Sequence, residues 1–411
     1  MNKNTNFTGQ PIFGQILQMI KRNQIHTIAI KHGTDRYYKK FTTYKHLVTM
    51  LYLAFEGCTS IREVTTGLLA CSTKLFHLGM DYSPKRSTLS DANKNRNSSV
   101  FQAIYMKLYQ NYASFLSDSR LSKIDLKRLY IVDSTTISLF KAILKGAGRK
   151  PKDPSKQKGG IKAHTMINAY ENVPCLIRYS AAAKHDHTFL KDINLSKGSY
   201  VTFDNAYNDY IQYKRFTEAG VWFVTLQKEN AIYELGDEYD IPEDIDDGVI
   251  KDEEIYLSYK EGGQEKKIKL RRVAYWADDR KRLLIFISNN FELPADLIAL
   301  IYKKRWQIET LFKQLKQNFP LKYFLGDNVN AIEIQIWVSM IANLLLSVLK
   351  TRIKRNWSFS NMASIIRQHL MNYINIYKFL NDPEKAWISI VEQKKVEYQN
   401  SLFPKLAGAY F

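Results

Sequence analysis

Hydrophobic residues recur at helical spacing through the first quarter of the chain. Apolar side chains three or four positions apart line one face of a helix, and the clearest such run is Ile12, Phe13, Ile16, Leu17 and Ile20. The stretch 41–55 repeats the pattern, and Ser60 followed by Glu63 has the spacing of a capping box. Short helices joined by basic loops suit a DNA-binding domain, although a helical packing domain has the same pattern. We predict an all-helical domain over residues 1–120.

The pattern changes to that of β-structure near Leu129. Three segments rich in β-branched and aromatic residues predict an antiparallel meander, and they span 129–140, 162–170 and 173–181. Helical and strand patterns then alternate over 187–195, 200–203, 210–219 and 221–226. Three antiparallel strands followed by alternating helices and strands is the order of a ribonuclease-H-like α/β fold. We predict the first part of such a core for residues 121–227.

Residues 228–290 interrupt this plan, and we predict a β-rich insertion there. The segment contains an acidic run, 236–254, followed by strand-like stretches at 266–275 and 283–288. A helix is expected from Pro294, so residues 291–355 form the second part of the core. Residues 356–411 are expected to be a helical C-terminal region, and they carry no motif.

One apolar run, 336–349, is too short to span a membrane and contains polar residues, among them Ser339 and Asn343. We therefore expect it to belong to a buried helix. The polar N-terminus lacks the apolar core of a signal peptide. Three cysteines without metal-binding spacing argue for a reducing compartment and against zinc or disulfides. We expect a soluble, cytoplasmic protein without a membrane partner.

The chain has a formal net charge of +20 over 411 residues, which favours a polyanionic partner. Its basic residues are spread over several segments and are not gathered on one amphipathic helix. DNA or RNA therefore fits better than a membrane surface. A generic basic protein without such a partner would have the same composition.

A charged motif lies on the helix expected after Pro294. Successive helical residues turn by roughly 100°, so a continuous helix would place four of its side chains on one narrow stripe: Tyr302, Arg305, Glu309 and Lys316. A carboxylate flanked by cations suits a metal and phosphate site, because the glutamate can bind metal while the cations hold phosphate oxygens. A solvated face with ion pairs inside the helix is the commoner origin of such a stripe.

Two aspartates favour the metal and phosphate site. Asp133 stands in an otherwise apolar or hydroxylic strand, where a carboxylate is costly unless it is paired or metal-bound. Asp204 directly follows the strand 200–203, at the carboxyl end where ligands of α/β sheets bind. A turn or cap role is a common alternative for such a residue. Together with Glu309, the two aspartates offer hard oxygen ligands for two Mg²⁺ or Mn²⁺ ions.

These residues resemble the motifs of DDE transposases from bacterial insertion sequences, in the group marked by a Tyr-x2-Arg-x3-Glu-x6-Lys (YREK) signature. The stripe from Tyr302 to Lys316 matches this spacing in full, and VDSTT around Asp133 and FDNAY around Asp204 match the contexts of the first two acids. Two further stretches resemble segments common in the group, namely KGGIKAHT (158–165) and AKHDH (183–187).

The resemblance implies a ribonuclease-H-like core with a β-rich insertion and an all-helical N-terminal domain. The implied reaction is hydrolysis at the transposon end, followed by attack of a 3′-hydroxyl on target DNA. Asp133, Asp204 and Glu309 would be catalytic and would hold two Mg²⁺ or Mn²⁺ ions. Phosphates would be bound by Tyr302, Arg305 and Lys316. The implied partners are double-stranded DNA, as transposon ends and target, and a second copy of the chain in a synaptic homodimer.

Two alternatives share these residues: a catalytically silent, domesticated DNA-binding relative, and a metal nuclease without strand transfer. Trp276, His164 and the pair His185-Asp186 also have more than one interpretation. Trp276 is either a base-stacking residue or a core tryptophan. His164 and the pair His185-Asp186 either line the site or bind metal. Otherwise His164 neighbours a phosphate or is structural, and Asp186 caps a helix.

Overall fold

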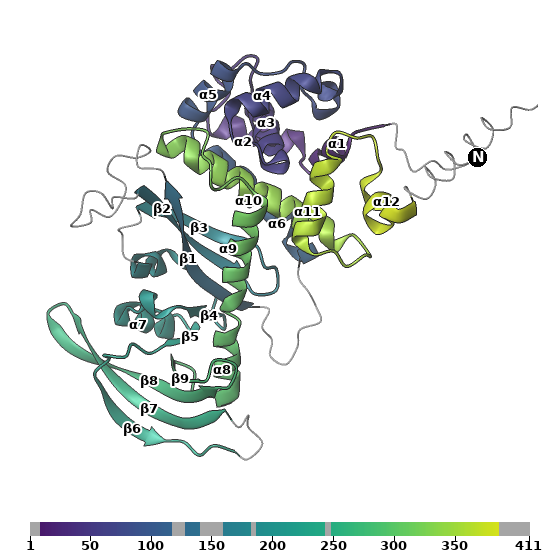
Figure 1. The fold of residues 1–411 in the computed structure, drawn as a ribbon. Helices are drawn as coiled ribbons and strands as arrows, with labels where there is room; N and C mark the ends of the chain where they lie inside the picture. Colours follow the sequence, from purple (N-terminus) through teal and green to yellow (C-terminus); the bar gives the residue numbers. More distant parts are fainter. Residues whose placement is uncertain (1–8, 117–127, 140–158, 182–185, 243–247, 386–411) are drawn as a thin grey trace, which may run out of the picture. The chain divides into compact units, whose positions relative to one another are not determined.

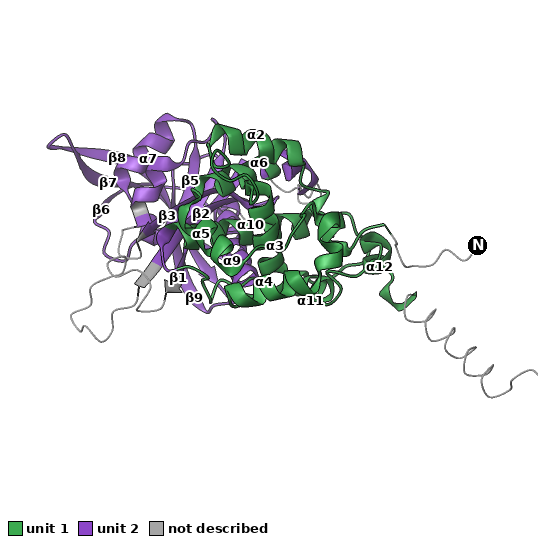
Figure 2. Ribbon diagram, turned by 90° about the horizontal axis from the view of Figure 1, so that it is seen from above, with its two compact units in different colours: residues 1–108, 317–326, 330–411 green, residues 109–316, 327–329 purple. Residues whose placement is uncertain are grey.

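The computed structural model describes residues 9–116, 128–139, 159–181, 186–242 and 248–385. The chain divides into two compact units (Figure 2). The helical unit comprises residues 1–108, 317–326 and 330–411, and the sheet unit comprises residues 109–316 and 327–329. The C-terminal segment 386–411, for which we predicted helix, lies outside the described residues.

The N-terminal part of the helical unit has the predicted all-α character. It contains α1 (Ile12–Leu17), α2 (Arg22–Lys31), α3 (Thr43–Glu56), α4 (Ile61–Ala70), η1 (Ser72–Leu78), α5 (Arg86–Asn95) and most of α6 (Ser99–Leu116). The predicted capping box starts α4. The Ser60 hydroxyl accepts from the Glu63 N–H at 3.2 Å, and the Glu63 carboxylate accepts from the Thr59 N–H at 2.6 Å. Both bonds satisfy N–H groups at the helix start that have no partner within the helix.

The chain completes the helical unit with α10 (Val329–Thr351), α11 (Phe359–Gln368) and α12 (Ile376–Asn381). By length and composition α10 is apolar enough to cross a membrane, but 89% of its most apolar window is buried inside the structure. The buried Gln335 side chain of α10 donates to the carbonyl oxygens of Pro320 at 2.6 Å and Tyr323 at 2.7 Å. The predicted buried helix is therefore confirmed.

The sheet unit is built on one nine-stranded sheet with the strand order β3-β2-β1-β4-β5-β9-β8-β7-β6 (Figure 1). Its first strands are β1 (Leu129–Leu139), β2 (Gly159–Asn168), β3 (Pro174–Ala181), β4 (Tyr200–Phe203) and β5 (Trp222–Leu226). Strands β1 to β3 form the predicted antiparallel meander, whereas β4 is parallel to β1 and β5 is parallel to β4. The connections contain η4 (Asp186–Asp192), η5 (Asn205–Tyr207) and α7 (Tyr210–Glu218). The unit is therefore mixed α/β.

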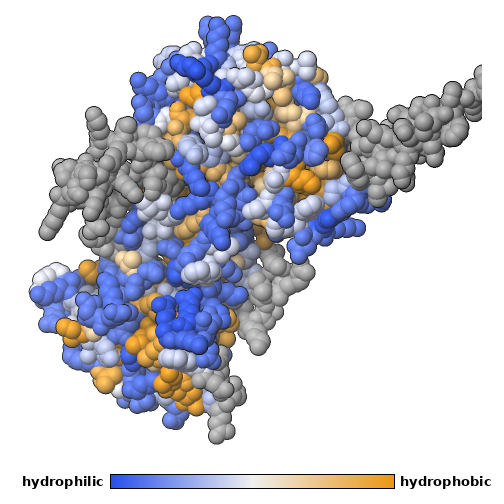
Figure 3. Space-filling model, in the orientation of Figure 1, coloured by the Kyte–Doolittle hydropathy of each residue, from blue (hydrophilic) through white to orange (hydrophobic). Residues whose placement is uncertain are grey.

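The segment 228–290 is rich in β-structure and extends the same sheet. It contributes β6 (Tyr233–Glu238), β7 (Val249–Glu261), β8 (Gln264–Ala277) and β9 (Arg282–Ser288). Strand β9 pairs antiparallel with β5 and thereby joins these strands to the rest. Some large hydrophobic side chains are exposed in this region (Figure 3), and they include Ile232, Leu235, Ile250, Trp276 and Leu283.

Strand β7 does not follow from the sequence pattern, because its first half belongs to the acidic run. Its acids are nevertheless buried, and cations of the neighbouring strand β8 compensate them. The Arg271 Nε atom donates to Asp252 Oδ1 at 2.8 Å, and Arg272 pairs with Glu253. Cross-strand charge pairing therefore allows an acidic segment to form an inner strand.

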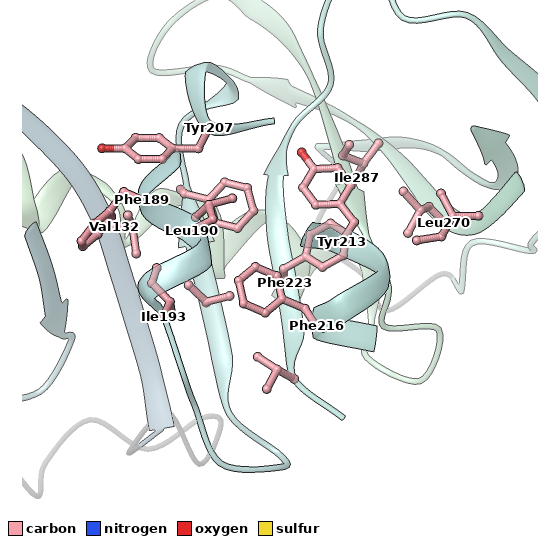
Figure 4. Packing of buried hydrophobic residues seen from close by; sticks show 14 of the residues in the cluster. Val132, Phe189, Leu190, Ile193, Tyr207, Tyr213, Phe216, Phe223, Leu270 and Ile287 are labelled. Atoms are coloured by element: carbon pink, nitrogen blue, oxygen red, sulfur yellow. The ribbon is translucent and has the colours of Figure 1, made fainter. Parts of the chain in front are cut away.

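One face of the sheet packs against η4 and α7. Val132 of β1 and Phe203 of β4 meet Phe189 of η4 and Phe216 of α7 in one buried cluster (Figure 4). Successive side chains along a strand point to opposite faces of the sheet. Because Val132 points into this cluster, Asp133 lies on the other face of β1.

The other face of the sheet is covered by α8 (Ala295–Lys303), which packs against β4, β5 and β9. On β9, Ile287 belongs to the buried cluster on the α7 face, so its neighbour Phe286 points the other way. The Phe286 ring lies 5.2 Å from the Tyr302 ring of α8, centroid to centroid. Helix α8 therefore leads the chain to the face on which Asp133 lies.

The structure corrects the expectation of one continuous helix from Pro294 to Lys316. Helix α8 ends at Lys303, and α9 (Trp306–Asn318) begins after a turn at residues 304–305. Hydrogen bonds that span three residues replace the four-residue pattern there: the Arg305 N–H donates to the Tyr302 carbonyl at 2.9 Å, and the Ile308 N–H donates to the Arg305 carbonyl at 3.2 Å. The four signature residues are thus distributed over two helices and the turn between them.

Candidate active site

The strand register places Asp133 and Asp204 side by side. Val132 of β1 pairs with Phe203 of the parallel strand β4. Asp133 and Asp204 are the residues that directly follow this pair. Asp204 directly follows β4, and its Oδ1 accepts from the Ala206 N–H at 3.0 Å, which caps η5. The cap role considered for Asp204 is therefore real, and it fixes the carboxylate at the carboxyl end of the strand.

Arg305 bridges the first acid and the third. Its Nη1 donates to Asp133 Oδ2 at 2.9 Å, and its Nη2 donates to Glu309 Oε1 at 2.7 Å. The Arg305 side chain is 10% exposed, and those of Asp133 and Glu309 are 17% and 34% exposed. Charge-assisted hydrogen bonds in such a partly buried setting are among the stronger polar contacts in proteins. The turn between α8 and α9 thus brings Arg305 to Asp133 and Glu309.

The surroundings of Asp133 raise the pKa of its carboxyl group to about 6. Burial is the main cause, and the nearby acids Asp204 and Glu309 add to it. The Ser134 N–H, which donates to Asp133 Oδ1 at 2.7 Å, and the Arg305 guanidinium oppose the rise. The three acids therefore lie close enough to repel one another, and an additional cation would stabilise their ionised forms.

The two remaining signature residues differ in their surroundings. Tyr302 is only 5% exposed, and its ring packs on Phe286 with the Arg305 guanidinium carbon 5.6 Å from the ring centre. Lys316 is exposed, and its Nζ donates to the backbone carbonyl of Thr136 at 3.3 Å. Thr136 lies three residues beyond Asp133 on β1. Phosphate binding by Tyr302, Arg305 and Lys316 stays a prediction.

The donor chemistry of this site fits a divalent metal ion. Three carboxylates on β1, at the end of β4 and on α9 are the hard oxygen ligands that Mg²⁺ and Mn²⁺ prefer. Among the described residues Arg305 pairs with Asp133 and Glu309, which leaves negative charge that a metal ion would balance. Within the described part of the chain, no three His, Cys, Asp or Glu side chains are grouped closely enough to hold an ion as they stand. Instead, the Arg305 guanidinium lies between the Asp133 and Glu309 carboxylates.

A polar cluster on the other face of β1 has no counterpart in the sequence-derived site. Asp186 accepts from the Ser134 hydroxyl at 3.1 Å and from the Lys162 ammonium at 3.0 Å. His164 is 2% exposed and lies within 3.5 Å of Asp186 and 3.3 Å of the Tyr207 hydroxyl. The helix-cap role considered for Asp186 therefore does not account for its bonds to Ser134 of β1 and Lys162 of β2. The sequence analysis considered His164 and Asp186 as site residues but gave no indication of their contacts with Ser134, Lys162 and Tyr207, and His185 lies outside the described residues.

The tryptophans near the signature are exposed. Trp276 is 41% exposed and donates its indole N–H to Asp278 at 2.9 Å, so the core position considered for it is wrong. Trp306, at the start of α9, is 53% exposed and lies under the Arg280 guanidinium at 5.3 Å. A cavity of about 120 Å³ extends from Trp306 to Tyr302 and Arg305. Sequence reasoning did not single out Trp306.

Comparison with known proteins assigns most of the chain to families. Residues 125–345, which include all three acids, match the family described as the transposase DDE domain. Residues 8–81 match a family described only as a domain of unknown function. The piggyBac transposase synaptic complex with hairpin DNA aligns over 89% of this chain and 78% of its own, at 13% identity and a TM-score of 0.38. Because this TM-score is low, the fold is described from the strand order and register and not from this likeness.

Three curated relatives are named as transposases. A putative transposase of Sinorhizobium fredii is 31% identical over 65% of this chain and 72% of its own length. A probable insertion-sequence transposase of Geobacillus stearothermophilus is 26% identical over 59% of this chain and 62% of its own. A putative insertion-sequence transposase of a Synechocystis strain is 28% identical over 64% and 71%. With the matched domain covering more than half of its length, this chain belongs to the DDE transposase family of insertion sequences.

Proposed function

We propose that this chain is an active transposase that cleaves the ends of an insertion sequence and joins their 3′-hydroxyls to target DNA. The observation that carries the proposal is the adjacency of Asp133 and Asp204 in the β1–β4 register, together with Glu309 linked to Asp133 through Arg305. The strand order of β1 to β5 supports a ribonuclease-H-like core for residues 121–227 and 291–355, with residues 228–290 inserted.

In this proposal Asp133, Asp204 and Glu309 hold two Mg²⁺ or Mn²⁺ ions. Bound ions of this kind supply activation of the attacking oxygen and stabilisation of the leaving oxygen in phosphoryl transfer. Arg305 neutralises Asp133 and Glu309 while DNA is absent, and it turns to a phosphate oxygen when a DNA strand enters. Lys316 and Tyr302 hold phosphates on the same strand. The hydroxyl that attacks comes from water in the first step and from the transposon end in the second.

The helical N-terminal region, residues 1–120, is proposed to bind DNA through the loop between α2 and α3. Arg96 is 1% exposed and fixes this loop from inside: it donates to the Phe41 carbonyl at 2.7 Å and lies 4.5 Å over the Tyr38 ring. The outer side chains of the loop are exposed, and they are Arg36, Tyr37, Lys39 and Lys40. A loop that is already ordered loses little entropy when it binds phosphates.

As the family resemblance implies, two chains would bridge two transposon ends in a synaptic homodimer. Measuring the mass of the chain complexed with a duplex carrying one transposon end would test this stoichiometry. One chain holding two ends would refute it.

Cleavage of one labelled transposon-end duplex tests the catalytic proposal. Full-length wild-type chain should nick the duplex in Mg²⁺ and join the freed 3′-hydroxyl to a target plasmid. Asp133→Asn and Glu309→Gln should bind the duplex at least as tightly and should not nick it, because each loses a metal ligand and one negative charge. Nicking without joining would favour a metal nuclease. Nicking by Glu309→Gln at the wild-type rate would refute the assignment of the third acid.

A further inference from the structure

The polar cluster behind β1 links the two neighbouring strands that carry the first two acids. Ser134 directly follows Asp133, and strand alternation points its side chain to the opposite face of the sheet. Tyr207 is the last residue of η5, the short helix that Asp204 caps with its own side chain. The Ser134 hydroxyl is connected to the Tyr207 hydroxyl through the side chains of Asp186 and His164. This chain of contacts joins the residue beside Asp133 to the turn that starts at Asp204.

Short polar contacts form this chain and surround it. Asp186 accepts from the Ser134 hydroxyl at 3.1 Å and from the Lys162 ammonium at 3.0 Å. The His164 Nδ1 atom lies 3.3 Å from the Tyr207 hydroxyl, and its Nε2 atom lies 2.9 Å from the Ser180 hydroxyl. The cluster therefore draws side chains from β1, β2, β3, η4 and η5 into one set of polar contacts.

Burial makes this arrangement rigid. Tyr207 and His164 are 1% and 2% exposed, and the His164 ring stacks on Phe189 with centroids 5.4 Å apart. The Lys162 and Asp186 side chains are 15% and 18% exposed. Buried polar groups are costly unless all their partners are in place, so this network favours one relative position of β1 and η5.

We propose that Ser134, Asp186 and Tyr207 form a positioning network that fixes the spacing of the Asp133 and Asp204 carboxylates. The proposal rests on the proposed function, in which these two acids bind metal together. None of the three side chains touches DNA or metal in this role. They act through the backbone of the acids, as hydrogen-bonded partners behind metal ligands do, and loss of such partners typically weakens metal binding or activity by about 10- to 100-fold.

Direct Mn²⁺ binding to the full-length chain tests the network, with the free ion measured by electron paramagnetic resonance. Ser134→Ala and Tyr207→Phe should raise the Mn²⁺ dissociation constant by about tenfold or more. Ser134→Thr keeps the hydroxyl and should restore wild-type affinity. Tyr109→Phe is the matched control, because it deletes another phenol of the same unit, one that donates to the Glu171 carboxylate. This control should bind Mn²⁺ like the wild type.

Cleavage kinetics give a second readout. Tyr207→Phe should lower kcat on a transposon-end duplex and leave the affinity for that duplex unchanged. Wild-type Mn²⁺ affinity in both Ser134→Ala and Tyr207→Phe, with binding lost in Asp133→Asn, would overturn the network and leave the proposed function standing. Wild-type Mn²⁺ affinity in Asp133→Asn would overturn the metal site itself and the network with it.

Discussion

Replacing Asp133 by asparagine should stabilise the metal-free chain at pH 8 while abolishing cleavage. The folded protein raises the pKa of Asp133 from 3.8 to about 6, so it binds a proton more tightly there than the unfolded chain does. This contribution to stability is fully present below pH 3.8 and is lost as the pH rises through about 6. The pKa difference corresponds to about 3 kcal/mol, so Asp133→Asn should exceed the wild type in unfolding free energy by up to that amount at pH 8.

The assay is denaturant unfolding of both proteins in the absence of metal, at pH 4, 6 and 8. The advantage of the variant should be small at pH 4 and should grow with pH. Asp192→Asn, at a side chain that is 39% exposed, controls for the general effect of an amide. Mg²⁺ at pH 8 should stabilise the wild type and leave Asp133→Asn unchanged. A variant that is less stable than the wild type at pH 8 would show that the Arg305–Asp133 pair outweighs burial and would refute the reasoning.

Three further predictions concern other charges. Arg305→Gln should tighten Mn²⁺ binding by about tenfold, because it removes the cation between Asp133 and Glu309. Calorimetry measures the change in affinity, with Lys316→Gln as the control. An equal gain in that control would show that the loss of any nearby positive charge explains the effect. The combined change of Arg36, Lys39 and Lys40 to alanine should weaken DNA binding. It should also flatten the salt dependence of binding by about one unit of slope for each phosphate that the loop no longer binds. An unchanged slope in fluorescence anisotropy would argue against DNA binding by this loop. Asp237, Glu238 and Asp240 should face away from DNA, so amides in their place should leave cleavage unchanged at moderate salt; a large rise in DNA affinity would contradict this placement.

Local patterns were sufficient to predict the framework around the first two acids. The β-rich segment around Asp133 and the short strand before Asp204 are both encoded by residues adjacent in the sequence, and the meander predicted from them is present. The helix break at 304–305 was not predictable in this way. It accompanies the contacts of Arg305 with Asp133, 172 residues earlier in the chain, and helical periodicity contains no information about such a partner.

Pairings between distant segments account for the other differences. The acidic half of β7 forms a strand because it pairs with Arg271 and Arg272 of β8. The sequence of β7 alone shows only that acidic residues have a low β propensity. The network around Asp186 is assembled from five separate elements, so its members have no common spacing in the sequence. Helix α10, in contrast, is apolar along most of its length, and its burial could be predicted directly.

The pairing of β5 with β9 has a consequence for how the chain folds as it is synthesised. Val224 of β5 pairs with Ser288 of β9, so β5 lacks its second neighbour until the whole intervening segment has been made. The β7–β8 hairpin, which turns at Gly262 and Gly263 with φ of 60° and 82°, is local and can form first. A nascent chain that stops before β9 exposes an open strand edge, which is prone to aggregation. Truncations meant to isolate the first half of the sheet should therefore be insoluble, and shortening of the insertion should retain β9.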